Sequence, residues 1–409
     1  MPEKRILLNK ADEIDPGDIQ SYEAQGGFSA LKKALDMSAE AVTEEVKASG
    51  LRGRGGAGFP CGVKWELAMK SPGDTKYLIC NADEGEVGTF KDRYILQHNP
   101  FSLLEGMAIT AYAIGAGKAY IYLRAEYRYL LEGLQKAISQ CEEKGFLKDL
   151  KIEIREGAGA YICGEESALM NSIEGKRGES RFRPPFPPQS GLFEKPTIIN
   201  NVETLANVPP IMEKGSAWYA AMGTEQSKGT KLFCVSGDVE KPGVYEMELG
   251  SSLRELVENL AGAKDIGWVQ VGGSTGAIIP SGRLETTLSY ETVLGSGAVM
   301  VFNQSRDVID FVYRTMEFLN EESCGKCTPC REGTEVMVEV LGRLVSGEGV
   351  SGDIEVLQEL SETMKVSSLC GLGQTAPIPV LDSLKYFREN YENRISQSVL
   401  LRSLKAING

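Results

Sequence analysis

The sequence is poor in histidine, with His98 as the one example in 409 residues. A chain with one imidazole cannot build a two-histidine metal site by itself, which excludes paired-histidine zinc hydrolases. A serine-histidine-aspartate triad would have to use His98, and its surroundings, residues 96–100 (LQHNP), contain no nucleophile motif. We therefore predict a noncatalytic histidine at a helix end or on the surface.

Long apolar runs and an excess of positive charge are also missing. The nearest approach to a membrane span, residues 106–123, is interrupted by two glycines and a lysine, and the first eight residues lack the apolar core of a secretion signal. Forty-four basic against 57 acidic residues give a net charge of −13, which repels nucleic acid and anionic membranes. We expect no nucleic-acid binding, no direct membrane insertion and a cytoplasmic location, free or on the cytoplasmic side of a membrane complex.

The order of predicted elements divides the chain into three domains. From residue 75 to 228, strand-like runs (76–81, 118–123, 151–155) alternate with helical ones (100–115, 126–144), which is typical of βαβ units. A further helix is predicted over 30–48. Shorter segments then indicate a small α+β domain, and apolar residues at helical spacing after residue 307 indicate a helical bundle. The predicted domains are 1–228, 229–313 and 314–409.

The strongest chemical signal is a cysteine motif. Cys324, Cys327 and Cys330 lie at intervals of three, and Cys370 follows 40 residues later. Three closely spaced thiolates with a distant fourth suit a [4Fe-4S] cluster, because one turn can present three sulfurs to one face of the cubane. Structural zinc more often uses two separated Cys-x-x-Cys pairs, and it stays open as the alternative. Five other cysteines share no ligand spacing and are predicted to be small buried hydrophobes: Cys61, Cys80, Cys141, Cys163 and Cys234.

A glycine-rich loop is the second signal. Gly53, Gly55 and Gly58 match the dinucleotide-binding fingerprint, but the predicted helix over 39–48 stands where a strand is expected, so a standard Rossmann start is not predicted. The loop still offers backbone that approaches an anionic ligand closely, with Arg54 and Lys64 supplying charge.

Three polar segments follow this loop, at residues 81–86 (NADEGE), 159–166 (GAYICGEE) and 200–204 (NNVET). The first lies at the end of a predicted strand, where doubly wound proteins form their ligand crevice. Each segment alone reads as turn residues and helix caps, whereas together with the cysteine motif they indicate a ligand site.

In these motifs the chain resembles the flavin-carrying, NADH-oxidising subunit family of respiratory complex I, with its relatives in NAD-linked hydrogenases and formate dehydrogenases. The resemblance runs from about residue 25 to the end. It implies an α/β Rossmann-like flavin domain, a ubiquitin-like β-grasp domain and a four-helix bundle that holds the cluster.

The resemblance also implies ligand roles for particular residues. Those around FMN would be Gly53, Arg54, Gly55, Lys64, Asn81, Asp83, Tyr161, Gly164, Glu165, Asn200, Asn201 and Thr204, with Asn201 and Thr204 at the phosphate. Those around NADH would be Phe59, Lys64, Glu86, Glu166, Arg183 and Phe186. Leu67 and Arg183 depart from the family pattern of phenylalanine and lysine, which puts adenine stacking in doubt. Cys61, beside the loop, is either a redox-sensitive thiol or, as we expect, an unreactive filler.

The implied activity needs no catalytic side chain, because the cofactors supply the chemistry; Glu86 and Glu165 would lie near the reacting rings. NADH would pass a hydride to FMN, and single electrons would then leave through the cluster of Cys324, Cys327, Cys330 and Cys370. The implied partners are a thioredoxin-like [2Fe-2S] subunit and a further iron-sulfur or catalytic subunit. Two alternatives remain: an FMN and iron-sulfur subunit of a membrane ferredoxin:NAD oxidoreductase, and a nonenzymatic scaffold stabilised by zinc.

Overall fold

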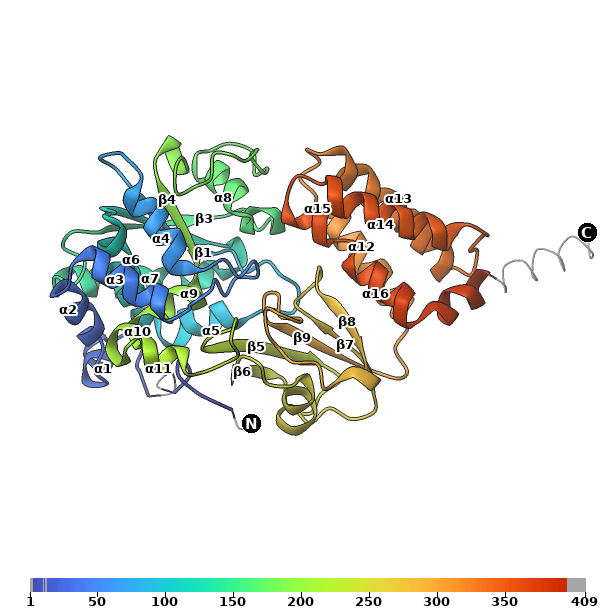
Figure 1. Ribbon diagram of the computed structural model, residues 1–409, viewed down its shortest axis with the longest axis horizontal. Helices are drawn as coiled ribbons and strands as arrows, with labels where there is room; N and C mark the ends of the chain where they lie inside the picture. Colours follow the sequence, from blue (N-terminus) through green and yellow to red (C-terminus); the bar gives the residue numbers. More distant parts are fainter. Residues whose placement is uncertain (1–2, 10, 12, 396–409) are drawn as a thin grey trace, which may run out of the picture.

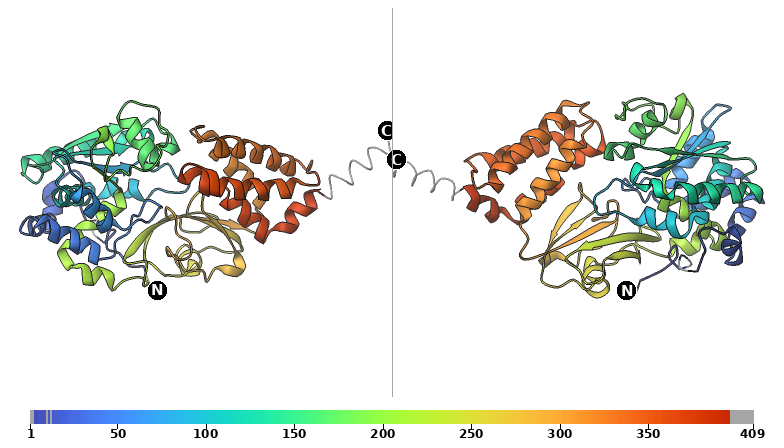
Figure 2. Two further views of the ribbon diagram at one scale, coloured as in Figure 1. Left: turned by 45° about the horizontal axis from the view of Figure 1, so that its top comes forward. Right: turned by 180° about the vertical axis from the view of Figure 1, so that it is seen from behind.

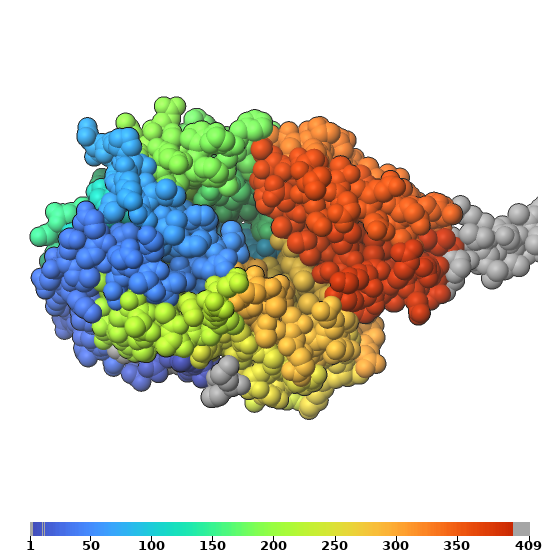
Figure 3. Space-filling view, viewed as in Figure 1, coloured from blue at the N-terminus to red at the C-terminus, as the bar shows by residue number. Residues whose placement is uncertain are grey.

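The structure, a computed structural model, describes residues 3–9, 11 and 13–395. Figure 1 shows an α/β part in blue and green, a curved sheet in yellow, and a group of helices in orange and red. The sheet lies beside both other parts, and in the space-filling view a recess opens where the α/β part approaches the helices (Figure 3). Of the described helices, none combines the length and hydrophobicity that a membrane crossing requires.

Four parallel strands form the sheet of the α/β part, in the order β3-β2-β1-β4. Their bounds are β1 Tyr77–Ala82, β2 Lys118–Leu123, β3 Lys151–Glu156 and β4 Thr197–Asn201. The first three confirm the predicted strands to within one residue. The sequence analysis did not predict β4, because its second half is two polar asparagines. The all-parallel order, with helices connecting the strands, is that of a Rossmann-like domain.

Helices cover both faces of this sheet. Their bounds are α1 Ile19–Ala24, α2 Ser29–Leu35, α3 Ala39–Ala48, α4 Cys61–Lys70, α5 Lys91–His98, α6 Pro100–Ile114, α7 Leu131–Glu143, α8 Glu166–Ile173, α9 Val202–Ala206, α10 Val208–Lys214 and α11 Ser216–Ala220. The central helix is α6, which is apolar almost all round and packs against α2, α3, α4, α9 and α10. It begins where the Asn99 side chain accepts from the Ser102 N–H and ends at Gly115, whose φ is 73°.

Two predicted helices are corrected. The helix expected over 30–48 is broken into α2 and α3, because the Ser38 hydroxyl accepts from the Ala41 N–H and begins a new helix there. The helix expected over 126–144 begins as a 3-10 helix, η1 Ala125–Leu130, and becomes α-helical only from Leu131. The predicted histidine position is confirmed: His98 is the last residue of α5, with its ring 4.3 Å from that of Tyr94.

The sheet domain consists of β5 Thr230–Gly237, β6 Gly243–Glu248, β7 Ile266–Val271, β8 Ala277–Pro280 and β9 Ala298–Asn303. The strand order is β6-β5-β9-β7-β8, with β5 and β9 parallel and the other neighbours antiparallel. A short π-helix, η4 Glu255–Leu260, buries Leu256 and Val257 in the same core as the strands. These elements form the small α+β domain that the sequence predicts.

The helical part comprises α12 Val308–Glu321, α13 Thr328–Val345, α14 Asp353–Ser367, the short α15 Gly371–Thr375 and α16 Ile378–Tyr386. The four longer helices pack in a closed ring, α12 on α13, α13 on α14, α14 on α16 and α16 on α12, which makes a bundle. In both views of Figure 2 this bundle extends away from the α/β part. A stack of Trp268, Phe302 and Phe311, with the first two rings 3.9 Å apart, joins it to the sheet domain.

Candidate functional site

The glycine-rich loop lies between α3 and α4 and is closed by a hydrogen bond of 2.9 Å from the Gly53 N–H to the Phe59 carbonyl. Gly58 has a φ of 65°, and a Cβ there would lie 2.4 Å from the Tyr290 ring, so only glycine fits. A Cβ on Gly55 would lie 3.0 Å from the Cβ of Asn201. Gly55 therefore packs closely against Asn201, and it is otherwise exposed.

Contrary to the prediction from the sequence, Arg54 does not present its charge to a ligand. Its side chain is completely buried behind the loop. The guanidinium donates to the Tyr219 hydroxyl at 2.9 Å and to the Lys228 and Thr230 carbonyls at 2.7 and 3.1 Å. Arg54 therefore anchors the loop from within the protein.

The residues expected at the flavin phosphate lie at the start of α9, next to the loop. The Asn201 carboxamide oxygen accepts from the Glu203 N–H at 3.0 Å and from Lys91 at 3.2 Å, and its amide nitrogen donates to Asp92 at 2.6 Å. Thr204 is buried, and its hydroxyl accepts from the Arg54 N–H at 2.8 Å. Thr204 thus fixes the loop, while Asn201 remains beside the loop with its amide oriented by the charged pair.

Asn200 and Lys64 form hydrogen bonds at the carboxyl end of β4. The Trp65 indole N–H donates to the Asn200 carboxamide oxygen at 3.0 Å, and Lys64 donates to the Ile199 carbonyl at 2.8 Å. Cys61, nearby, is buried, and burial raises the pKa of its thiol to about 12. A thiol that stays protonated at neutral pH is unreactive, which favours the filler role.

At the end of β1 the structure leaves one buried polar atom without a partner. Asn81 donates to the Gly164 carbonyl at 2.9 Å and accepts from the Asp83 N–H at 3.1 Å. Among the described residues, none donates to the Asp83 Oδ2 atom, and burial raises the pKa of this carboxyl to about 7. Buried carboxylate oxygens normally have donors, so this atom marks a place for a ligand group.

Charged side chains from three segments of the chain lie together at the amino terminus of α8. Glu165 caps this helix by accepting from the Ser167 and Ala168 N–H groups. Glu166 forms ion pairs with Lys64 at 3.3 Å and with Arg183 at 3.0 Å, and Arg183 also pairs with Glu165. The two carboxylates are therefore already balanced by two cations.

Glu86 and Tyr161 link all three domains. The Tyr161 hydroxyl donates to Glu86 at 2.8 Å, and Glu86 also accepts from the Ser274 N–H of the sheet domain at 2.6 Å. The Tyr161 N–H donates to Glu322, next to the bundle helix α12, at 2.8 Å. Glu86 is thus held by protein donors, and it positions Tyr161.

Two aromatic rings expected at the nucleotide are exposed. Phe59 is 51% exposed and Phe186 is 48% exposed. Leu67 is 43% exposed. Phe182, which the sequence analysis did not single out, is 72% exposed and has Lys326 5.2 Å from its ring centre. Exposed aromatic faces on the loop and on the proline-rich segment are available for stacking.

The four motif cysteines line one cavity, together with Ile162, Ser323, Leu369 and Leu372 among others. Cys327 and Cys370 directly precede α13 and α15. The Leu369 N–H donates to the Cys327 sulfur at 3.5 Å, and the Ser323 hydroxyl lies 3.3 Å from the Cys330 sulfur. The other five cysteines are all buried, as predicted.

Comparison with known proteins gives matches in all three parts of the chain. Residues 46–210 match the Nuo51 FMN-binding domain, 232–278 the SLBB domain, and 310–394 the NADH-ubiquinone oxidoreductase-F iron-sulfur binding region. The chain is 46% identical to an NADH-quinone oxidoreductase F subunit of Rhizobium meliloti, over 96% of this chain and 98% of that one. This chain belongs to the family of NADH-quinone oxidoreductase F subunits.

Hydrogenase subunits are also similar to this member of the F-subunit family. The NADP-reducing hydrogenase subunit HndC of Solidesulfovibrio fructosivorans is 43% identical, over 96% of this chain and 83% of that one. A crystal structure of an NAD+-reducing [NiFe]-hydrogenase superposes with a TM-score of 0.88 at 40% identity, and covers 96% of this chain and 67% of that one.

The cysteine cavity of this F-subunit family member fits an iron-sulfur cluster. Within the described part of the chain, no group of three or more histidine, cysteine or acidic side chains is arranged for a single metal ion. The four cysteines nevertheless surround a common cavity. Sulfurs spread around a space, with N–H and O–H groups beside them, suit a cluster better than a single zinc ion.

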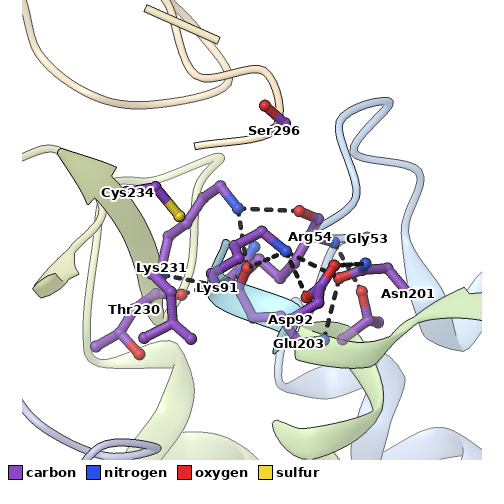
Figure 4. Close-up of polar contacts among 12 residues, drawn as sticks. Gly53, Arg54, Lys91, Asp92, Asn201, Glu203, Thr230, Lys231, Cys234 and Ser296 are labelled. Carbon is purple, nitrogen blue, oxygen red and sulfur yellow. Dashed lines mark hydrogen bonds and ion pairs between the residues drawn. The ribbon is translucent and has the colours of Figure 1, made fainter. Parts of the chain in front are cut away.

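The sequence analysis missed several residues that build the flavin side. Lys91, Asp92, Glu203 and Lys231 are buried and form an ionic network with the glycine-rich loop (Figure 4). Charged residues carry no sequence signal for burial, since such residues are usually exposed. Only Glu203, within the segment 200–204 already singled out, lay in a motif.

Proposed function

We propose that this chain is the NADH-oxidising, or NAD-reducing, flavoprotein subunit of a multisubunit oxidoreductase. It exchanges a hydride between NAD(H) and FMN and passes single electrons through a [4Fe-4S] cluster to a partner subunit. The observation that carries the proposal is the segment η2, Tyr161–Gly164. Its Gly164 carbonyl accepts from Asn81 of the flavin side, and its Ile162 lines the cysteine cavity. One short segment thus contacts both cofactor sites.

For the flavin, the loop backbone at Gly53 and Gly55 supplies a surface that a ring or a phosphate can approach. Asp83 supplies an unpartnered acceptor oxygen, and Asn81 holds it in place. Asn201 at the start of α9 is the residue proposed for the phosphate, whereas Arg54 and Thr204 act by fixing the loop. Bound FMN supplies the conversion between two-electron and one-electron chemistry.

For the nucleotide, Phe59 and Phe186 offer exposed faces for stacking. Glu166 is proposed to favour NADH, because a ribose hydroxyl donates to a carboxylate whereas a 2′-phosphate is repelled by it. Its ion pairs with Lys64 and Arg183 reduce that repulsion, so we expect a moderate preference. Tyr161, which donates to Glu86, and Glu165, which caps α8, orient the segment η2 without transferring protons.

The domain organisation and partners are also proposals. The sheet order with a parallel central pair, β5 and β9, supports a ubiquitin-like β-grasp domain over 229–313. The division at 313 falls within α12, so we propose that the bundle domain begins with that helix. The relatives are named as subunits, which supports the presence of partner subunits. We further propose that these are a thioredoxin-like [2Fe-2S] subunit and a further iron-sulfur or catalytic subunit, at a cytoplasmic location.

Cofactor analysis of the purified chain tests the proposal. We expect roughly four irons and one FMN per chain, with NADH-dependent reduction of an artificial acceptor. A protein that contains zinc and no iron would overturn the cluster assignment. A protein that binds no flavin at micromolar concentrations would overturn the assignment of the activity.

A further inference from the structure

The glycine-rich loop depends on contacts from outside itself. Within the loop, Gly53 donates to the Phe59 carbonyl, and the Arg52 side chain donates to the Gly58 carbonyl at 2.6 Å. Arg54, near its start, is held by Thr204 of α9 through the N–H and by the sheet domain through the carbonyl, which accepts from Lys231 at 2.9 Å. The shape of this loop is therefore set partly by a domain that lies far along the sequence.

Lys231, on β5, is completely buried, and it also forms an ion pair of 3.0 Å with Glu203 of α9. Glu203 in turn pairs with Lys91 at 3.0 Å, and Lys91 with Asp92 at 2.7 Å. Figure 4 shows these side chains converging below the loop. Burial lowers the pKa of Lys231 to about 8, against the opposing effect of Glu203, so the ammonium remains charged at pH 7.

A second contact from the sheet domain holds the loop independently. The Tyr290 hydroxyl donates to the Gly53 carbonyl at 2.7 Å, and its ring occupies the space beside Gly58. The Arg52 guanidinium lies 4.1 Å from the centre of the same ring. Lys231 and Tyr290 thus hold the carbonyls of two consecutive loop residues, Arg54 and Gly53.

We propose that Lys231 and Tyr290 are positioning residues of the flavin site, through which the sheet domain holds the glycine-rich loop in its binding conformation. The inference rests on the proposed flavin-binding function of this loop. Neither side chain needs to touch the flavin. A loop that is already ordered does not lose conformational entropy when the ligand binds, so both contacts increase affinity by preorganisation.

The test uses the full-length chain with two variants and two matched controls. Lys231→Met removes the buried ammonium, and Thr230→Val changes the preceding buried residue, whose hydroxyl donates to Glu246 instead. Tyr290→Phe removes only the hydroxyl, which donates to the Gly53 carbonyl and accepts from the Arg54 guanidinium at 3.2 Å. Tyr245→Phe removes a hydroxyl of the same domain that donates to the Lys241 carbonyl. FMN affinity is measured by flavin fluorescence, and iron content reports the integrity of the cluster.

We expect Lys231→Met to weaken FMN binding by at least about tenfold and Tyr290→Phe by about threefold, with iron content and both controls within about twofold of the parent. In flavin-free protein, hydrogen exchange of residues 52–59 should become faster in both variants, while exchange in the bundle stays unchanged. A purely structural defect would accelerate exchange throughout the chain.

Unchanged FMN affinity and unchanged loop exchange in Tyr290→Phe and Lys231→Met would overturn the inference. If Lys231→Met fails to fold, Tyr290→Phe decides, because it leaves no buried charge unpaired. Should the parent chain bind no FMN, the proposed function fails, while loop exchange in flavin-free protein still tests the hold on the loop.

Discussion

The cysteine cavity and the glycine-rich loop were both found as sequence motifs, yet they are built in different ways. Around the cavity, all four motif cysteines line the same space, so the motif residues are themselves the proposed ligands. At the loop, Arg54 and the neighbouring Thr204 of α9, both expected to contact the flavin, have their polar groups bonded to the protein. A metal-binding motif consists of the residues whose atoms bind the metal, whereas a glycine-rich motif consists of residues that allow a particular backbone conformation.

The largest effect is expected from breaking the cavity alone. Cys370→Ser should reduce iron from roughly four per chain to nearly none, because the cluster loses one of four thiolate ligands, while FMN content stays near one. Iron and flavin analysis of the same preparation measures both. Cys141→Ala, which changes a buried cysteine of α7, is the control and should keep both cofactors. Parallel loss of FMN in Cys370→Ser would show that the two sites are not separate.

On the proposed flavin side, Asp83→Asn should weaken FMN binding by about tenfold, since the substitution replaces a carboxyl whose Oδ2 has no partner among the described residues with a neutral amide. Fluorescence titration of flavin-free protein measures the dissociation constant. Asp382→Asn is the matched control, because burial also raises the pKa of this carboxyl, which lies on α16. Equal affinities in the parent and Asp83→Asn would remove Asp83 from the site.

The charge balance at α8 predicts a smaller change in nucleotide preference. Glu166→Gln should lower the ratio of kcat/KM for NADH over NADPH by about three- to tenfold, because Lys64 and Arg183 already neutralise part of the carboxylate charge. An artificial acceptor allows both nucleotides to be measured. Glu174→Gln, at the other end of α8, should leave the ratio unchanged. A ratio insensitive to Glu166→Gln would remove this residue from nucleotide selection.

The smallest predicted effect is a pH dependence of the amino-terminal segment, residues 4–8, which should leave the helical bundle unaffected. Glu246 accepts from the N–H groups of Ile6, Leu7 and Leu8, and burial raises its pKa to about 7. An acid whose pKa is higher in the folded state binds extra protons there, so stability falls as pH rises towards and through this pKa. Between pH 6 and 8 we expect a loss of about 1 kcal/mol in the docking of residues 4–8.

Hydrogen exchange of that segment measures this loss, and it should be absent in Glu246→Gln. Peptides of α13 in the same samples provide the internal control. A pH dependence that is identical in the parent and the variant would assign the effect to another group.

The sequence predicted those features whose cause is local. The strand β2 was predicted with its observed bounds, and α6 to within one residue, because a short continuous apolar run, a proline start and a glycine end act over neighbouring residues. The break between α2 and α3 was not predicted, since the Ser38 cap competes with helical propensity that continues on both sides. β4 was missed because its asparagines resemble a loop.

By itself, the sequence indicated the chemistry of this protein: the cysteine spacing that favours a cluster, the glycines that allow a tight loop, and the single histidine that excludes a two-histidine metal site. Only the tertiary structure decided which polar groups face a ligand and which hold the scaffold. Lys231 and Glu203 are 28 residues apart and Lys231 and Arg54 are 177 apart, and all three are buried together. The sequence does not encode such a network as a pattern, because the free energy of burying a charge depends on partners that only folding brings close.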